Sequence, residues 1–222
     1  MRSQTAGVTV PAAGAALAGD LVVPEDPRGV VAFAHGSGSS RRSPRNRAVA
    51  GALHQAGLAT LLFDLLTEDE ERVDAVTAEH RFDIPLLGRR LVAAVDWLAG
   101  QPATSRLPVG LFGASTGAAA ALAAAARRPD LVRAVVSRGG RPDLAGDDLE
   151  RVRVPVLLVV GGEDHEVLRL NDAAAARLAG PHSVYVVPGA THLFAEPGTL
   201  DQAAAAAREW FTRMAAASAP PP

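Results

Sequence analysis

The sequence predicts an α/β fold in which a mostly parallel sheet is covered by helices on both faces. Apolar runs of strand length alternate along the chain with longer segments of helical periodicity, as in parallel α/β proteins. The strand-length runs are apolar throughout, which is typical of strands buried on both faces. The 222 residues, 48% of them hydrophobic, suffice for one sizeable core. We therefore expect one domain over residues 1–218 and a disordered tail at 219–222.

The predicted strands are short runs rich in Val, Leu, Ala and Phe. We expect an opening hairpin at residues 8–10 and 20–23, and buried strands at 30–34, 60–63, 109–112, 132–137, 154–160 and 183–187. In a parallel sheet the carboxyl ends of the strands meet at one edge, where ligands and catalytic groups gather. The residues that follow each run are therefore the first candidates for chemistry.

The predicted helices have recognisable start and stop signals. The first begins after Ser43 with Pro44 at the first helical position and ends before Gly57. The helices are expected at residues 44–56, 84–98, 115–128, 167–178 and 199–217. The connection 65–83 carries an acidic run at 68–71, and we interpret it as a loop that either covers the site or is mobile, with its charges in solvent.

Composition excludes several functional classes. The formal net charge is −2, and all 22 basic residues are Arg, which we interpret as residue-usage bias rather than as an RNA-binding signal. There is no Cys, and no window approaches the ~20 apolar residues of a membrane span. We expect a cytoplasmic protein, monomeric or homodimeric, with no nucleic-acid or membrane partner.

The central motif is Gly-x-Ser-x-Gly at Gly113, Ser115 and Gly117. It follows the strand 109–112 directly and precedes an Ala-rich helix. A Ser on such a strained strand-to-helix turn exposes its hydroxyl, and the flanking glycines leave room for the turn. The following helix aims its first amides at developing negative charge. Ser115 is therefore the predicted nucleophile.

An acid and a base follow this Ser in the appropriate order. Asp164 comes directly after the buried strand 154–160, with Glu163 and Glu166 as alternative acids. His192 lies in a small-residue loop after the last strand. The order Ser, Asp, His distinguishes this architecture from other arrangements of the same triad.

A fourth segment, at residues 35–38, follows the strand 30–34. Its small residues Gly36 and Gly38 allow a substrate to approach the backbone. We expect the amides of Ser37 and Thr116 to form an oxyanion hole, a device worth ~3 kcal/mol per donor. His35 is interpreted as bracing this segment, because His192 fills the role of base better.

These four segments resemble the α/β-hydrolase superfamily, and most closely its small dienelactone-hydrolase-like members. The resemblance spans nearly the whole chain and rests on residues 35–41, 113–117, 161–167 and 189–194. It implies an eight-stranded, mostly parallel sheet with an antiparallel second strand and no large cap domain, and hydrolysis of esters or lactones through an acyl-enzyme. The best-known dienelactone hydrolases use a Cys nucleophile, so the resemblance is to serine-using relatives. Some relatives are fused to a phosphoribosyltransferase domain, and we expect no such second domain here.

Other residues are candidates for substrate contact. Arg138 follows the strand 132–137 and either binds a substrate carboxylate or phosphate or pairs with the acidic connection. Arg41 flanks the oxyanion segment within a group of Arg residues that is otherwise interpreted as solvated. The remaining candidates are His80 and Phe82 at the end of the long connection and Leu193 and Phe194 beside His192.

The sequence thus predicts a serine hydrolase for small-molecule carboxylic esters or lactones. Two alternatives stay open: acyl transfer or perhydrolysis on the same triad, and a catalytically silent ligand-binding protein with the same fold. No cofactor is expected. Metal catalysis is not indicated either, because the six His show no His-Glu-x-x-His spacing.

Overall fold

Eight strands form one sheet in the order β1-β2-β4-β3-β5-β6-β7-β8 in this computed structural model, which describes residues 3–12 and 14–218. The strands are β1 (Ser3–Ala12), β2 (Ala15–Pro24), β3 (Gly29–Ala34), β4 (Leu58–Phe63), β5 (Val109–Ala114), β6 (Val132–Arg138), β7 (Val156–Gly161) and β8 (His182–Val187). β2 is antiparallel to both its neighbours, and every other pair is parallel. The expected sheet, with its second strand antiparallel, is confirmed. The predicted tail 219–222 lies outside the described residues.

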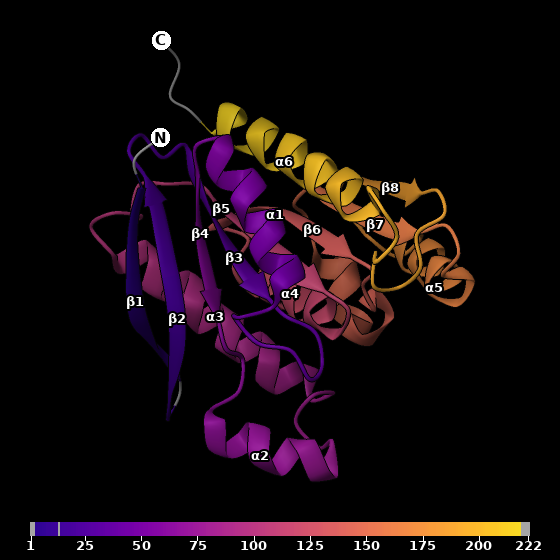
Figure 1. Cartoon of the computed structure of the whole chain (residues 1–222), viewed down its shortest axis with the longest axis horizontal. Coiled ribbons are helices and arrows are strands. Elements are labelled where there is room, and N and C mark those ends of the chain that lie inside the picture. Colours follow the sequence, from indigo (N-terminus) through magenta and orange to yellow (C-terminus); the bar gives the residue numbers. More distant parts are fainter. Residues whose placement is uncertain (1–2, 13, 219–222) are drawn as a thin grey trace.

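Helices cover both faces of the sheet (Figure 1). One face carries α1 (Pro44–Gln55) and α6 (Thr199–Ala217). The other carries α3 (Ile84–Gly100), α4 (Thr116–Arg127), α5 (His165–Ala175) and the short 3₁₀ segment η1 (Pro142–Arg151). In Figure 1, α2 (Glu68–Thr77) lies apart from both layers, beyond one end of the sheet. Two cores therefore form, one on each side of the sheet.

Four strands of the sheet, β3, β4, β5 and β7, are completely buried, as their continuous apolar runs predict. The helix after β5, α4, has Ala at eight of its twelve positions and buries its residues 116–125. Small side chains let this helix pack close to the strands, so that its first turn is fixed at the carboxyl edge of the sheet.

The connection 65–83 contains a helix, so the prediction of an irregular loop was wrong. The Thr67 hydroxyl accepts a hydrogen bond from the amide of Glu70, and the Glu70 carboxylate accepts one from the amide of Thr67 at 2.8 Å. This capping box starts α2, and its acidic first turn suits the positive end of the helix. Asp74 is the one buried residue of α2, so the helix lacks the apolar periodicity by which helices are recognised.

Several element boundaries differ from those predicted. The opening hairpin is longer, because β1 and β2 pair over ten residues each. β7 begins two residues later than expected, and α5 begins at His165 because Asp164 is its N-cap residue. Within the described residues, no helix combines the length and the apolarity that crossing a bilayer requires.

Candidate active site

Ser115 lies in a strained turn between β5 and α4. Its φ of 51° and ψ of −122° are unfavourable for a residue with a side chain. The glycines on either side make the turn possible. A Cβ on Gly113 would lie 2.4 Å from the Cα of Ala118, and one on Gly117 would lie 2.1 Å from the carbonyl oxygen of Ala34. The turn places Ser115 at the N-terminus of a buried helix, where negative charge is stabilised.

His192 is hydrogen-bonded to Asp164, with 2.7 Å between Nδ1 and Oδ2. Asp164 is the N-cap residue of α5, but its carboxylate makes no capping bond and is therefore available to the imidazole. Of the three acids left open by the sequence, Asp164 is the one that faces His192, whereas Glu163 lies 3.9 Å from His165. When Nδ1 carries the proton and donates it in a hydrogen bond to this carboxylate, Nε2 is unprotonated and can accept a proton.

Ser115 and His192 line one pocket of about 240 Å³ at the carboxyl edge of the sheet. Asp164 lies behind the imidazole, with its side chain 14% exposed. In the described part of the chain no hydrogen bond joins the Ser115 hydroxyl to the imidazole. In hydrolases without bound substrate, the hydrogen bond between nucleophile and base is often long or poorly aligned.

The loop that carries His192 is braced by Glu196. The hydroxyl and the amide of Thr191 donate hydrogen bonds to its carboxylate at 2.6 and 3.0 Å. These bonds, with that of the hydroxyl foremost, lower the pKa of Glu196. Sequence reasoning missed Glu196, because a carboxylate five residues after Thr191 reaches back only when the loop folds into this shape.

The oxyanion segment packs against the Ser115 turn. The hydroxyls of Ser37 and Thr116, the two residues whose amides were predicted to bind the oxyanion, lie 3.1 Å apart. A Cβ on Gly36 would lie 3.0 Å from the Cβ of Ser115, so a side chain there would crowd the nucleophile. The two predicted donor residues are thus adjacent.

His35 is buried beneath this segment. Its Nε2 accepts a hydrogen bond from the amide of Leu65 at 2.9 Å, so the proton is on Nδ1, which donates to the carbonyl oxygen of Gly36 at 3.0 Å. Burial lowers the pKa of His35, which favours this neutral form. Both ring nitrogens are occupied, in keeping with a bracing role.

Several of the predicted substrate-contact residues lie in or beside two neighbouring cavities. Arg138 and Leu193 line the pocket of Ser115, whereas Phe194 is buried under the Arg138 guanidinium, 5.6 Å from ring to cation. Gly38 lines a neighbouring cavity of about 450 Å³, between the oxyanion segment and α2. Glu71 and Arg81 line this cavity too. Glu71 was predicted to lie in solvent with the rest of its acidic run, because no helix was predicted there from which to orient the side chain.

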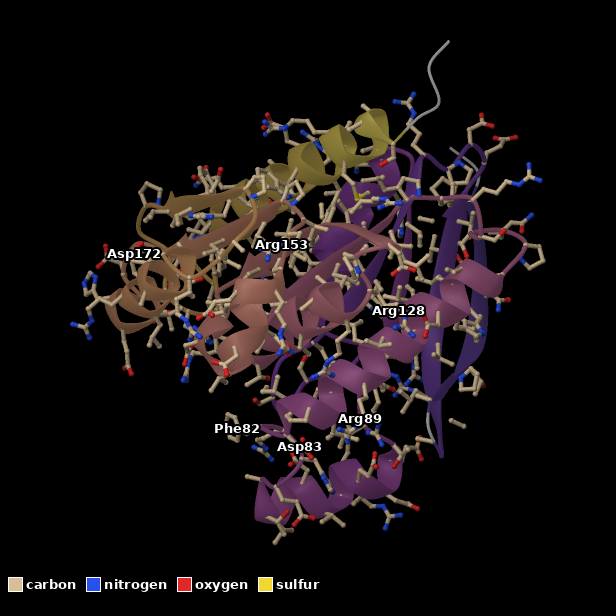
Figure 2. All side chains as sticks on the ribbon, turned by 180° about the vertical axis from the view of Figure 1, so that it is seen from behind. Phe82, Asp83, Arg89, Arg128, Arg153 and Asp172 are labelled. Carbon is tan, nitrogen blue, oxygen red and sulfur yellow. The ribbon has the colours of Figure 1, made fainter. Side chains whose placement is uncertain are left out.

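Three predicted contacts are directed elsewhere. Arg41 is ion-paired with Asp64, which follows β4. The imidazole of His80 lies 3.3 Å from the carboxylate of Glu79. Phe82 is 57% exposed in the connection between α2 and α3 (Figure 2). Within residues 3–12 and 14–218, no group of three or more His, Asp or Glu side chains is placed to hold a metal ion.

Comparison with known proteins decides the family. The model of the dienelactone hydrolase family matches residues 17–216. This chain belongs to the dienelactone hydrolase family. The crystal structure of a dienelactone hydrolase from Anabaena variabilis is 54% identical, with a TM-score of 0.94 over 96% of this chain and 99% of that one. Est1E from Butyrivibrio proteoclasticus, at 18% identity and a TM-score of 0.79 over 95% of this chain and 99% of that one, shares the fold.

Curated relatives of this family member are longer. A Mycobacterium tuberculosis protein, provisionally named a phosphoribosyl transferase, is 63% identical over 195 residues, and its counterpart in a second strain matches equally well. The match covers 88% of this chain but 43% of the relative, so this chain spans less than half the relative's length. Membership of the dienelactone hydrolase family supports a hydrolase activity for the matched part.

Proposed function

We propose that this dienelactone hydrolase family member hydrolyses carboxylic esters or lactones of small molecules through an acyl-enzyme. The observation that supports this most is the 2.7 Å contact between His192 Nδ1 and Asp164, in the same pocket as a Ser115 held on a strained turn. An imidazole with its Nδ1 proton fixed by a carboxylate is a base for a neighbouring hydroxyl.

In this mechanism Ser115 Oγ attacks the acyl carbonyl carbon while its proton passes to His192 Nε2. The charge on the tetrahedral oxygen is stabilised by the amides of Ser37 and Thr116, at about 3 kcal/mol for each donor. The imidazolium then protonates the leaving alcohol. Water, deprotonated by His192, attacks the acyl-enzyme, and the imidazolium returns this proton to Ser115 Oγ as the bond from Oγ to the acyl carbon breaks and the acid is released.

The test is Ser115→Ala, with the exposed Ser105→Ala as control. We expect Ser115→Ala to keep its fold by circular dichroism and to lose about 10³-fold or more in kcat on a p-nitrophenyl ester. Ser105→Ala keeps the wild-type rate. Turnover retained by folded Ser115→Ala would refute the assignment.

Two further experiments address the two alternative functions. Analysis of products with alcohol or peroxide present separates hydrolysis from acyl transfer and perhydrolysis, because these replace water at the acyl-enzyme. A fluorophosphonate probe labels an activated Ser115 in the wild-type protein. Absence of labelling would instead indicate a catalytically silent binding protein.

A further inference from the structure

Arg138, at the carboxyl end of β6, carries a buried positive charge beside the catalytic pocket. Its side chain is 6% exposed, and its Nε has no hydrogen-bond partner. One terminal nitrogen lies 3.5 Å from the side-chain oxygen of Asn46, and the guanidinium lies over the ring of Phe194. No carboxylate forms an ion pair with Arg138 in the part of the chain that the structure describes. A buried charge without such a partner is costly.

A second guanidinium, that of Arg45 in the first turn of α1, lines the same pocket. Arg45 is half-buried, and among the described residues it too forms no ion pair with a carboxylate. Burial, followed by the charge of Arg45, lowers the pKa of Arg138 to about 10. The two positive charges thus lie at the same pocket and repel each other.

The rest of the pocket wall suits an anion. Besides His192, the remaining polar side chains of this pocket are the hydroxyls of Ser37, Ser39, Ser43 and Ser115 and the amide of Asn46, all of which can donate hydrogen bonds, and no Asp or Glu of the described residues lines it. The neighbouring cavity differs, because the two arginines that line it, Arg42 and Arg81, are accompanied there by two carboxylates, Glu71 and Asp74. An anion is therefore favoured on the Arg138 side of the oxyanion segment.

We propose that the substrate is an ester or lactone bearing a phosphate-like dianion, bound between Arg138 and Arg45. This inference rests on the proposed function and names its substrate class. A dianion neutralises both guanidinium groups, whereas a single carboxylate leaves one positive charge uncompensated. The planar fork of Arg also matches a pair of phosphate oxygens. Because Ser115 and His192 line the same pocket, the bound dianion and the scissile carbonyl would share it.

The test compares esters of equal length that end in a methyl, a carboxylate or a phosphonate group, placed on the acyl side in one set and on the alcohol side in another. In one of the two sets, we expect the kcat/KM of the phosphonate ester to exceed that of the methyl ester by about tenfold or more. The kcat/KM of the carboxylate ester in that set should lie between the two. Arg45→Gln removes this preference, so that within this variant the ratio of kcat/KM for the phosphonate ester to that for the methyl ester falls to about one. The exposed Arg47→Gln, on the same helix, keeps the preference.

A binding measurement separates this inference from the proposed function. Calorimetry with inorganic phosphate and Ser115→Ala should show binding that Arg45→Gln weakens about tenfold and Arg47→Gln does not. If the methyl esters are hydrolysed as fast as the phosphonate esters and phosphate does not bind, the dianion site is refuted. The proposed hydrolysis of esters would still stand. Preference for the carboxylate ester would overturn the choice of a dianion. If no ester is hydrolysed, the proposed function fails, while Arg45-dependent phosphate binding would still support the anion site.

Discussion

Ser115 and His192 owe their positions to side chains and glycines that take no part in the reaction. Gly117 makes room for the turn of Ser115, and Glu196 fixes the loop of His192. The proximity of Ser115, Asp164 and His192 was predictable, because the Gly-x-Ser-x-Gly motif and the order of acid and base are properties of the sequence. The braces were not, since each depends on a contact made after the loops have folded.

Long-range ion pairs limited the prediction of substrate contacts. Arg41 was a candidate because it flanks the oxyanion segment, yet Asp64, 23 residues away, takes its charge. Among the residues that the structure describes, Arg138 by contrast forms no ion pair with an acidic residue of the connection 65–83, the second partner considered for it, and a terminal nitrogen contacts Asn46 instead. Whether an Arg side chain forms an ion pair with a distant carboxylate depends on which strands are neighbours in the sheet. The order of the strands in the sheet cannot be read directly from the sequence.

At Gly117 we predict that an added methyl group disrupts the site. Gly117→Ala places a Cβ 2.1 Å from the carbonyl oxygen of Ala34, and backbone cannot yield as a flexible side chain does. We expect a loss of about 2 kcal/mol or more in the free energy of unfolding. Gly51→Ala, in α1 with open space around it, should instead gain up to about 1 kcal/mol. Urea denaturation measures both, and equal midpoints would contradict the prediction.

At the scale of elements, α2 is connected to the oxyanion segment through Arg90 of α3. The Arg90 guanidinium donates to the carbonyl oxygen of Leu65 at 2.7 Å and to both carboxylate oxygens of Glu70. The amide of Leu65 in turn donates to His35. The strands and most helices were predictable from apolar runs and helical periodicity. α2 was not, because capping and this ion pair, rather than an apolar face, hold it in place.

Glu70 should give α2 a stability that depends on pH. Hydrogen bonds from Arg90 hold the pKa of Glu70 at about 2, below its ordinary value of 4.5. The folded pKa is the lower one, so the contribution is present above pH 4.5 and is lost as the pH falls towards 2. At neutral pH, Glu70→Gln should cost on the order of 1–3 kcal/mol, partly because Arg90 is left buried without its partner.

The control for Glu70 is Glu68→Gln, an exposed residue in the same first turn. It should change stability by less than about 0.5 kcal/mol. Denaturation of both variants from neutral pH down to pH 3 gives the comparison, and the deficit of Glu70→Gln should shrink over the acidic part of this range. A deficit that stays constant would show that the carboxylate charge is not responsible.

At the scale of the whole molecule, one sheet separates two cores. Trp97 of α3 packs against the core that contains α4, and Trp210 of α6 packs against the core that contains α1. The sequence predicted helices on both faces, but not which helix covers which face, because that assignment depends on the order of strands in the sheet. We propose that residues 1–218 nevertheless unfold as one domain.

The two Trp residues provide the test of this proposal. Trp97→Phe leaves fluorescence from one face of the sheet, and Trp210→Phe leaves it from the other. In each variant the fluorescence midpoint in urea should coincide with the midpoint of circular dichroism, as two-state unfolding requires. Separate midpoints on the two faces would show that the cores unfold independently.

The strained backbone of Ser115 lowers the stability of the fold but keeps a hydroxyl at this turn. A residue held at positive φ costs of order 1–3 kcal/mol, and Gly would adopt the same conformation with little penalty. Pressure for heat tolerance alone would therefore favour replacing this hydroxyl-bearing residue. Its retention in a working enzyme would mean that selection tolerates a less robust fold in return for a reactive oxygen.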